Sequence, residues 1–187
     1  MKNIYLIVGQ SGSGKTTIVN CLEEKYGLKS IQSYTTRPKR SDDETGHIFI
    51  SDEEYDKLTN IVANTEFCGY RYCVQAEQID NNDLYVIDSV GVKTLKVLYK
   101  GIKKIKTIYK SSDLTTRYER MRLRAQRSGK KYLEAVEESL NRIVNDVKAF
   151  YNYEHHKTPI DLMVFNNEGG NLDSITEKIY NFIQDCE

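Results

Sequence analysis

Long apolar runs, paired cysteines and an excess of charge of one sign are all missing from this chain. No stretch approaches the ~18–20 apolar residues needed to span a bilayer, and the first apolar run is too short for a signal peptide. The 27 basic and 27 acidic side chains cancel to a formal net charge of +0, so no overall field favours nucleic acid or a membrane surface. We therefore expect a cytoplasmic protein without nucleic-acid or membrane partners.

Cysteine and proline are scarce. The 4 cysteines are scattered, and no Cys-x-x-Cys or nearby His pair completes a zinc site, so we expect free thiols. The 2 prolines mark no linker. A chain of 187 residues, 39% of them hydrophobic, suits one domain with a mobile part.

The most specific feature is a glycine-rich loop near the N-terminus. Residues 4–8 predict a buried strand and residues 15–26 a helix, so the loop joins a strand to a helix. Its sequence fits the phosphate-loop pattern G-x-x-x-x-G-K-[ST] in the expected context. Glycines let backbone N–H groups turn toward a phosphate, and the helix N-terminus favours the same anion. The residues predicted to bind ATP are Gly9, Gln10, Ser11, Gly12, Ser13, Gly14, Lys15, Thr16 and Thr17.

Two side chains of this loop have predicted chemical roles. We expect Lys15 to reach the β- and γ-phosphates of ATP, and the hydroxyl of Thr16 to ligate Mg²⁺. The cofactor expected is therefore Mg²⁺, with ATP as co-substrate.

Strand and helix patterns alternate along most of the remaining chain. This alternation predicts an α/β fold with a parallel sheet flanked by helices on both faces. The exception is a hairpin of strands at 61–67 and 70–74, which indicates an insert. Further strands are predicted at 30–33, 47–50, 84–88, 105–109 and 161–165, and helices at 52–58, 75–81, 91–100, 114–127 and 132–153, with a last one ending near 184.

One glycine and three polar residues lie at the ends of predicted strands. Because ligands of such sheets bind at the carboxyl ends of the strands, these residues could share one rim. They are Gly9, Ser33, Asp88 and Asn166.

A basic segment at 34–40 is predicted to be a loop, since Pro38 forbids a regular helix there. Arg37 and Arg40 could clamp a second phosphate through bidentate hydrogen bonds. The alternative is a solvated basic loop without a ligand.

A second basic cluster lies on the predicted helix 114–127. Arg117, Arg120 and Arg124 are three and four residues apart, so they share a helix face. The break at 128–131 could be the hinge of a lid that brings arginines onto a transferring phosphoryl group. Alternatively, some of these arginines only pair with nearby glutamates. No nucleophile–base dyad is evident, and a phosphate acceptor would not need one.

With these motifs in place, the chain resembles the guanylate kinase family of nucleoside monophosphate kinases over almost its whole length. The loop at 9–17 matches the family's ATP loop, and the run Ser33-x-Thr35-Thr36-Arg37-x-x-Arg40 matches its signature segment. Weaker matches are Phe67-x-Gly69-x-x-Tyr72, Asp88-x-x-Gly91-Val92, Arg120-Met121-x-x-Arg124, Arg142 and Asn166.

The resemblance implies roles for single residues. Arg37, Arg40 and Tyr72 would hold the phosphate of the acceptor, and Ser33 would touch its base. Arg124 and Arg142 would be catalytic together with Lys15. Asn166 would lie near the adenine of ATP, and Asp88 would either contact Mg²⁺ through a water molecule or only shape the site.

The resemblance also implies a division of the chain. The core would comprise residues 1–33, 84–124 and 141–187. A substrate-binding insert would span 34–83, and a helical lid 125–140. The partners would be ATP and a nucleoside monophosphate, and the protein a monomer or a weak homo-oligomer.

Several positions depart from the family pattern. His47 falls nearest the place of a tyrosine that contacts the acceptor phosphate, so we count it as substrate-binding. The glutamate that reads guanine would align with Ala63, or with Asn64 if the register slips; Glu66 is a candidate substitute. Val74 and Val86 replace two further polar positions. Apolar side chains cannot accept from the guanine N1–H and N2–H₂ groups.

Three functions are consistent with these residues. The first is ATP-dependent phosphorylation of a nucleoside monophosphate, with GMP or dGMP as the expected acceptor. The second is a kinase for another phosphorylated small molecule on the same scaffold, such as a different nucleotide or a ribose bisphosphate. The third is a non-catalytic module that binds phosphorylated peptides; the intact Lys15 and Thr16 argue against it.

Overall fold

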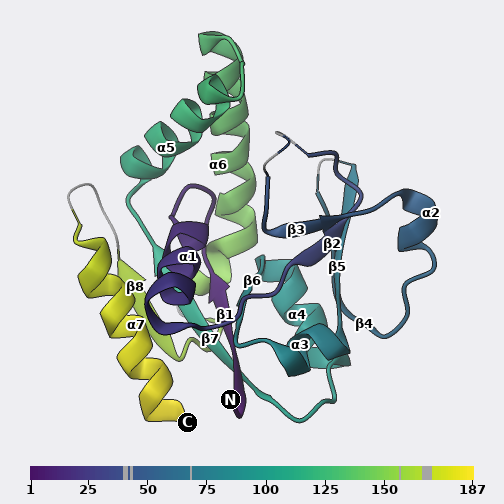
Figure 1. Ribbon diagram of the computed structural model, residues 1–187. Coiled ribbons are helices and arrows are strands. Elements are labelled where there is room, and N and C mark those ends of the chain that lie inside the picture. The colour runs from purple at the N-terminus through teal and green to yellow at the C-terminus, as the bar shows by residue number, and fades with distance from the viewer. Residues whose placement is uncertain (40–41, 43, 68, 156, 166–169) are drawn as a thin grey trace.

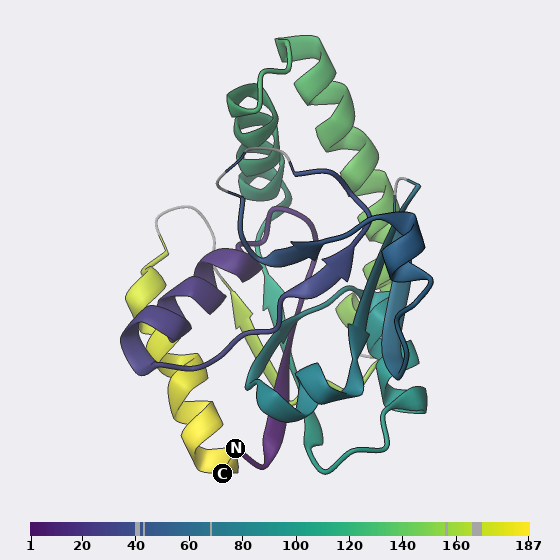
Figure 2. The same cartoon turned by 45° about the vertical axis from the view of Figure 1, so that its right-hand side comes forward.

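A computed structural model describes residues 1–39, 42, 44–67, 69–155, 157–165 and 170–187. Two four-stranded sheets form the molecule, with a pair of long helices projecting beyond them (Figure 1). The N- and C-termini lie side by side (Figure 2), and the backbone N–H of Lys2 donates to the Glu187 carboxylate at 2.6 Å. No described helix is long and apolar enough to cross a membrane.

The first sheet is parallel and has the strand order β6-β1-β7-β8. This confirms the predicted parallel sheet. The strand bounds are Asn3–Val8 for β1, Leu84–Val86 for β6, Lys104–Ser111 for β7 and Leu162–Phe165 for β8.

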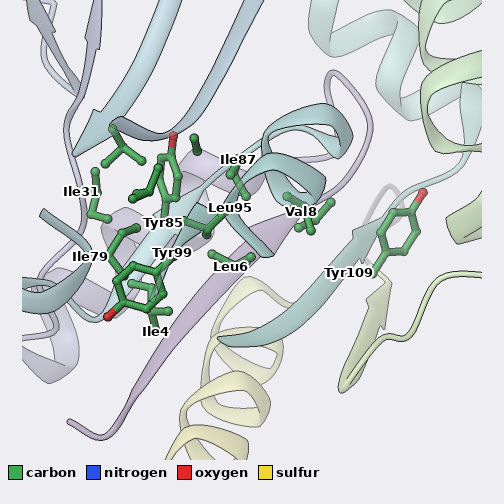
Figure 3. Close-up of a cluster of buried hydrophobic side chains, with 14 of the residues drawn as sticks. Ile4, Leu6, Val8, Ile31, Ile79, Tyr85, Ile87, Leu95, Tyr99 and Tyr109 are labelled. Atoms are coloured by element: carbon green, nitrogen blue, oxygen red, sulfur yellow. The ribbon is translucent and has the colours of Figure 1, made fainter. Parts of the chain in front are cut away.

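Helices cover both faces of this sheet, because the central strand is apolar on both sides. All of β1 is buried. Ile4, Leu6 and Val8 face one core (Figure 3), which also receives α4 and α6, whereas Tyr5 and Ile7 face a second core beneath α1 and α7. The helix bounds are Lys15–Tyr26 for α1, Ser89–Leu98 for α4, Leu114–Arg127 for α5, Tyr132–Glu154 for α6 and Leu172–Cys186 for α7.

The second sheet is mixed and has the order β3-β2-β5-β4. Strands β2 and β3 are parallel, while β5 is antiparallel to both β2 and β4. The bounds are Ser33–Thr35 for β2, His47–Phe49 for β3, Ile61–Phe67 for β4 and Tyr70–Gln75 for β5, with helices α2 at Asp52–Tyr55 and α3 at Ala76–Asn81.

Local signals explain several of the boundaries. Gly27 ends α1 in a left-handed conformation, with φ 67°. Ser51 and Glu54 form the predicted capping box of α2. The Asp113 carboxylate accepts from the backbone N–H of Thr116 and so starts α5.

Several boundaries differ from the sequence prediction: α2 ends at Tyr55 and β6 at Val86, α4 begins at Ser89, and β7 spans Lys104–Ser111. The strand predicted at 30–33 begins at Ser33 instead, because Ser30 makes only an isolated bridge to Leu84. Tyr34 and Thr35, predicted to be loop, continue that strand, since the antiparallel partner β5 supplies their backbone hydrogen bonds.

Candidate active site

The phosphate loop connects β1 to α1, as the motif predicted. Gly14 is the N-cap of α1 at φ 91°, a left-handed conformation that a residue with a Cβ adopts at a cost. Because no side chain caps this end of α1, its first N–H groups remain available to an anion.

Lys15 folds back over the loop. Its Nζ atom donates to the carbonyl oxygens of Gly9 at 2.7 Å and Gln10 at 3.0 Å. Burial lowers the pKa of the Lys15 ammonium to about 8. The Asp146 carboxylate opposes this shift, while the positive charge of Arg124 adds to it. Arg124 of α5 is therefore close enough to act on the charge of Lys15.

A cavity of about 500 Å³ opens beside this loop. The loop contributes Gly9, Ser11 and Lys15 to its wall. The other predicted site residues that line it are Ser33, His47, Tyr72, Asp88 and Arg142.

A second cavity of about 510 Å³ lies between the second sheet and α6. Arg37 and Lys130 line it. Tyr72, Asn145 and Arg142 line both cavities, so the two adjoin. Arg37 and the phosphate loop therefore face two neighbouring cavities.

Arg37 is buried, at 8% exposed, and held by an acid from its own loop. Its guanidinium forms two hydrogen bonds to the Glu44 carboxylate, at 2.7 and 3.2 Å. It also lies over the ring of Phe49, 5.3 Å from the centroid. Its Nε is buried and has no hydrogen-bond partner among the described residues, so the guanidinium keeps one unsatisfied donor. Arg40, predicted to act with it, lies outside the described residues.

Three side chains from three strands meet beside Arg37. The Oγ atom of Ser33 lies 2.9 Å from Nδ1 of His47, its register partner in β3. The ring of His47 meets Tyr72 of β5 edge-on, with centroids 5.7 Å apart. The structure therefore brings together three residues that the sequence spread over 40 positions.

Three of the positions that depart from the family pattern, Ala63, Val74 and Val86, are apolar. Ala63 is 1% exposed and lies directly opposite Val74 across β4 and β5. Ala63 and Val86 line the first cavity. Asn64 and Glu66 line it too, and both are exposed.

Asp88 follows β6 and caps α4. Its Oδ1 atom accepts from the backbone N–H groups of Val90 at 2.8 Å and Gly91 at 2.7 Å. Within the described ranges, no three His, Cys, Asp or Glu side chains cluster to hold a metal by themselves. A Mg²⁺ ion bound largely by substrate phosphates needs only one or two protein oxygens. The exposed hydroxyl of Thr16 and the carboxylate of Asp88 fit that need.

The predicted lid arginines lie on two helices. Arg142 of α6 is paired with Glu138 at 3.0 Å, and Glu138 also pairs with Lys130 at 2.7 Å. Lys130 belongs to the predicted break at 128–131, which separates α5 from α6. Asn166, predicted near the adenine, lies outside the described residues.

One member of this site, Asp146, was not predicted from the sequence. Asp146 lines the first cavity and accepts from the backbone N–H of Ser11 at 2.7 Å. Its position four residues after Arg142, on the same face of one helix, is the signal that could have found it.

Comparison with known proteins finds relatives described as guanylate kinases. It is 28% identical over 145 residues to a guanylate kinase of Polaromonas sp., covering 72% of this chain and 68% of that protein. It is 37% identical over 120 residues to a guanylate kinase of Mycoplasmopsis pulmonis, covering 58% and 57%. No protein-family model matches.

A solved structure extends the likeness to the fold. The crystal structure of guanylate kinase from Anaplasma phagocytophilum superposes with a TM-score of 0.58 at 18% identity, covering 98% of this chain and 85% of that one. The chain therefore resembles guanylate kinases in sequence and shares their fold.

Proposed function

We propose that this chain transfers the γ-phosphoryl group of ATP to a nucleoside monophosphate, with GMP and dGMP as the first acceptors to test. The observation that carries the proposal is the adjoining pair of cavities. Lys15 lines one and Arg37 lines the other, while Tyr72 and Arg142 line both. Two cationic groups facing adjoining cavities are what a phosphoryl transferase requires, since the donor and acceptor phosphates must lie side by side.

The donor half of the site is the phosphate loop at 9–17. Its backbone N–H groups and the N-terminus of α1 would hold the phosphates of ATP. Lys15 would exchange the Gly9 and Gln10 carbonyls for phosphate oxygens. Thr16, and Asp88 through a water molecule, would hold Mg²⁺, which when bound neutralises charge on the phosphates. Asn166 stays a prediction for the adenine contact.

The acceptor half lies on the insert sheet. The Arg37 guanidinium, the Tyr72 hydroxyl and the His47 ring would bind the acceptor's phosphate, with Arg40 as a further prediction. Ser33, hydrogen-bonded to His47, would face the base. Glu44 would keep the Arg37 side chain in place for this contact.

Catalysis would consist of positioning and charge neutralisation. The acceptor's phosphate oxygen is already an anion near neutral pH, so no general base is needed. Lys15, Arg124 and Arg142 would offset the negative charge on the transferring group. Arg142 is paired with Glu138 at 3.0 Å, so it would have to break this pair to reach the transferring group.

The same proposal divides the chain functionally. The core would be 1–33, 84–124 and 141–187, the acceptor-binding insert 34–83 and the lid 125–140. Closing the lid would exclude water from the transferring group and so favour the acceptor over hydrolysis.

A second candidate function keeps the kinase and changes the acceptor. Ala63, Val74 and Val86 offer no acceptor for the guanine N1–H and N2–H₂ groups, which favours a different base or a phosphorylated sugar. Exposed Glu66 and Asn64 on the cavity wall are the groups that could still read guanine.

The experiment is ADP release from ATP and Mg²⁺ with a panel of acceptors. GMP, dGMP, AMP, CMP, UMP, dTMP and ribose 1,5-bisphosphate cover both candidates. Turnover with GMP or dGMP supports the first, and turnover with another member supports the second. No turnover with any acceptor would contradict the kinase proposal.

A further inference from the structure

A buried ion pair joins α5 to α6 beside the phosphate loop. Nη2 of Arg117 lies 2.8 Å from Oδ2 of Asp146, and their side chains are only 5% and 10% exposed. A buried pair of this kind stabilises a protein only when its remaining donors and acceptors are also satisfied. The partners of those remaining atoms are therefore informative.

The remaining atoms all turn to the phosphate loop. Asp146 accepts from Ser11 twice, from its backbone N–H at 2.7 Å and from its hydroxyl at 3.2 Å. Arg117 donates from Nε to the Ser11 carbonyl at 3.0 Å and from Nη1 to the Gln10 side chain. The ion pair thus binds both the backbone N–H and the carbonyl oxygen of Ser11.

The backbone of α5 also meets the loop at this point. A Cβ atom on Gly12, which has φ 74°, would lie 2.6 Å from the Arg117 carbonyl oxygen. Gly12 therefore allows the loop to approach Arg117 closely, and the ion pair holds it there.

The same two helices carry Arg124 and Arg142, which flank the proposed lid at 125–140. Arg142 precedes Asp146 by four residues, and Arg124 follows Arg117 by seven, so each arginine shares a helix face with one member of the pair. The pair thereby sets the distance between the phosphate loop and the arginines that would meet the transferring group.

We propose that Arg117 and Asp146 are positioning residues that hold the phosphate loop in its ATP-binding shape and align it with the lid helices. The proposal rests on the proposed function for the donor half of the site only. A pair that merely joined α5 to α6 would have no need of four hydrogen bonds to Gln10 and Ser11.

The test is ATP affinity in the variant Asp146→Asn. The variant keeps the shape of the side chain and removes its charge, so Arg117 is left without its counter-ion. We expect the Kd for Mg²⁺-ATP, measured by titration calorimetry, to rise about tenfold, and the KM for the acceptor to change less than about twofold. Glu119→Gln is the matched control, since it breaks an ion pair with Arg122 on α5 away from the loop and should leave the Kd for ATP unchanged.

A double variant separates positioning from fold stability. Replacing both partners by apolar residues, Arg117→Met with Asp146→Leu, removes the buried charges together and should recover the melting temperature lost in Asp146→Asn. The Kd for ATP should stay raised, because the loop has lost its anchor. Recovery of both quantities would make the pair purely structural and overturn the inference.

Other outcomes would also overturn it. Unchanged ATP affinity in Asp146→Asn would mean that the loop needs no anchor, and tighter binding would mean that Asp146 competes with phosphate. If Asp146→Asn does not fold, Arg117→Lys tests the same anchor, since it keeps the charge and loses the forked hydrogen bonds. Wild-type protein that binds ATP but phosphorylates no acceptor would contradict the proposed function and leave this test intact.

Discussion

The ammonium of Lys15 donates to the carbonyl oxygen of Gly9 at 2.7 Å, so the cation of the phosphate loop is held by the loop's own backbone. A bound phosphate would have to replace this contact. The exchange is favourable only while Lys15 is protonated, because a neutral amine has no charge to offer. Three of the predictions below follow from this relationship.

The first prediction concerns turnover. Lys15→Met keeps the length of the side chain and removes its charge, so we expect the rate of phosphoryl transfer to fall at least about 100-fold. ADP release at saturating ATP measures this. Lys25→Met is the control, because Lys25 lies on the same helix and pairs with Asp173 at the surface. Near-normal turnover in a folded Lys15→Met protein would exclude Lys15 from the chemistry.

The second prediction concerns the pH dependence of ATP binding. Since the pKa of Lys15 is lowered to about 8, the free protein loses this charge as the pH rises above about 8. The Kd for ATP should therefore be constant below pH 8. Above pH 8 it should rise, and the rise should approach tenfold for each pH unit. Titrations between pH 7 and 9.5 measure it. A Kd that is independent of pH over that range would contradict a charged Lys15 contact.

The third prediction concerns stability. The folded pKa of Lys15 lies below its ordinary value of 10.5, so the unfolded chain binds more protons between pH 8 and 10.5. Burial of the charge destabilises the fold fully below pH 8, and this cost disappears as the pH rises through that window. The melting temperature of Lys15→Met should therefore lie a few degrees above that of wild type at pH 7, since each kcal/mol of stability shifts it by about 2–4 °C in a protein of this size. At pH 10 the difference should be smaller. A lower melting temperature at pH 7 would contradict this.

The fourth prediction concerns the acceptor. Arg37→Ala should raise the KM for the nucleoside monophosphate about 100-fold and the KM for ATP less than about threefold, because Arg37 lines only the cavity away from the phosphate loop. Arg71→Ala is the matched control in the same sheet, since Arg71 pairs with Asp52 and Asp56 at the surface. Equal effects on both KM values would exclude a role for Arg37 in holding the acceptor.

The fifth prediction concerns selectivity for the base. Ala63→Glu places a carboxylate on the wall of the first cavity, where it can accept from guanine. We expect kcat/KM for GMP to rise at least about tenfold relative to that for AMP. Because a carboxylate at a 1% exposed position could impair folding, Val74→Ser, opposite Ala63, serves as a milder variant. Unchanged selectivity in both folded variants would mean that the base binds elsewhere.

Local signals were sufficient for much of the architecture. The apolar run at 4–8 and the glycine-rich loop identified β1, the phosphate loop and α1, because strand, turn and helix each have their own short-range pattern. Ser51 and Asp113 likewise marked the starts of α2 and α5.

Long-range pairing could not be derived in this way. Tyr34 was predicted to be loop because it belongs to the basic segment that contains Pro38. Its pairing with Cys73 of β5 makes it part of a strand. The anchor of the phosphate loop was missed for the same reason. Arg117 and Asp146 lie 29 residues apart on separate helices, and only the antiparallel return of α6 along α5 brings them to Ser11.

The most direct measurement follows the phosphoryl group itself by ³¹P NMR, with ATP, Mg²⁺ and GMP as substrates and Lys15→Met as the inactive reference. The account predicts that the γ-phosphate signal of ATP disappears while signals of ADP and a second nucleoside diphosphate appear together. If GMP is not the preferred acceptor, another member of the panel should give ADP together with its own new diphosphate. Release of inorganic phosphate without a new diphosphate, or no consumption of ATP with any acceptor, would contradict the account.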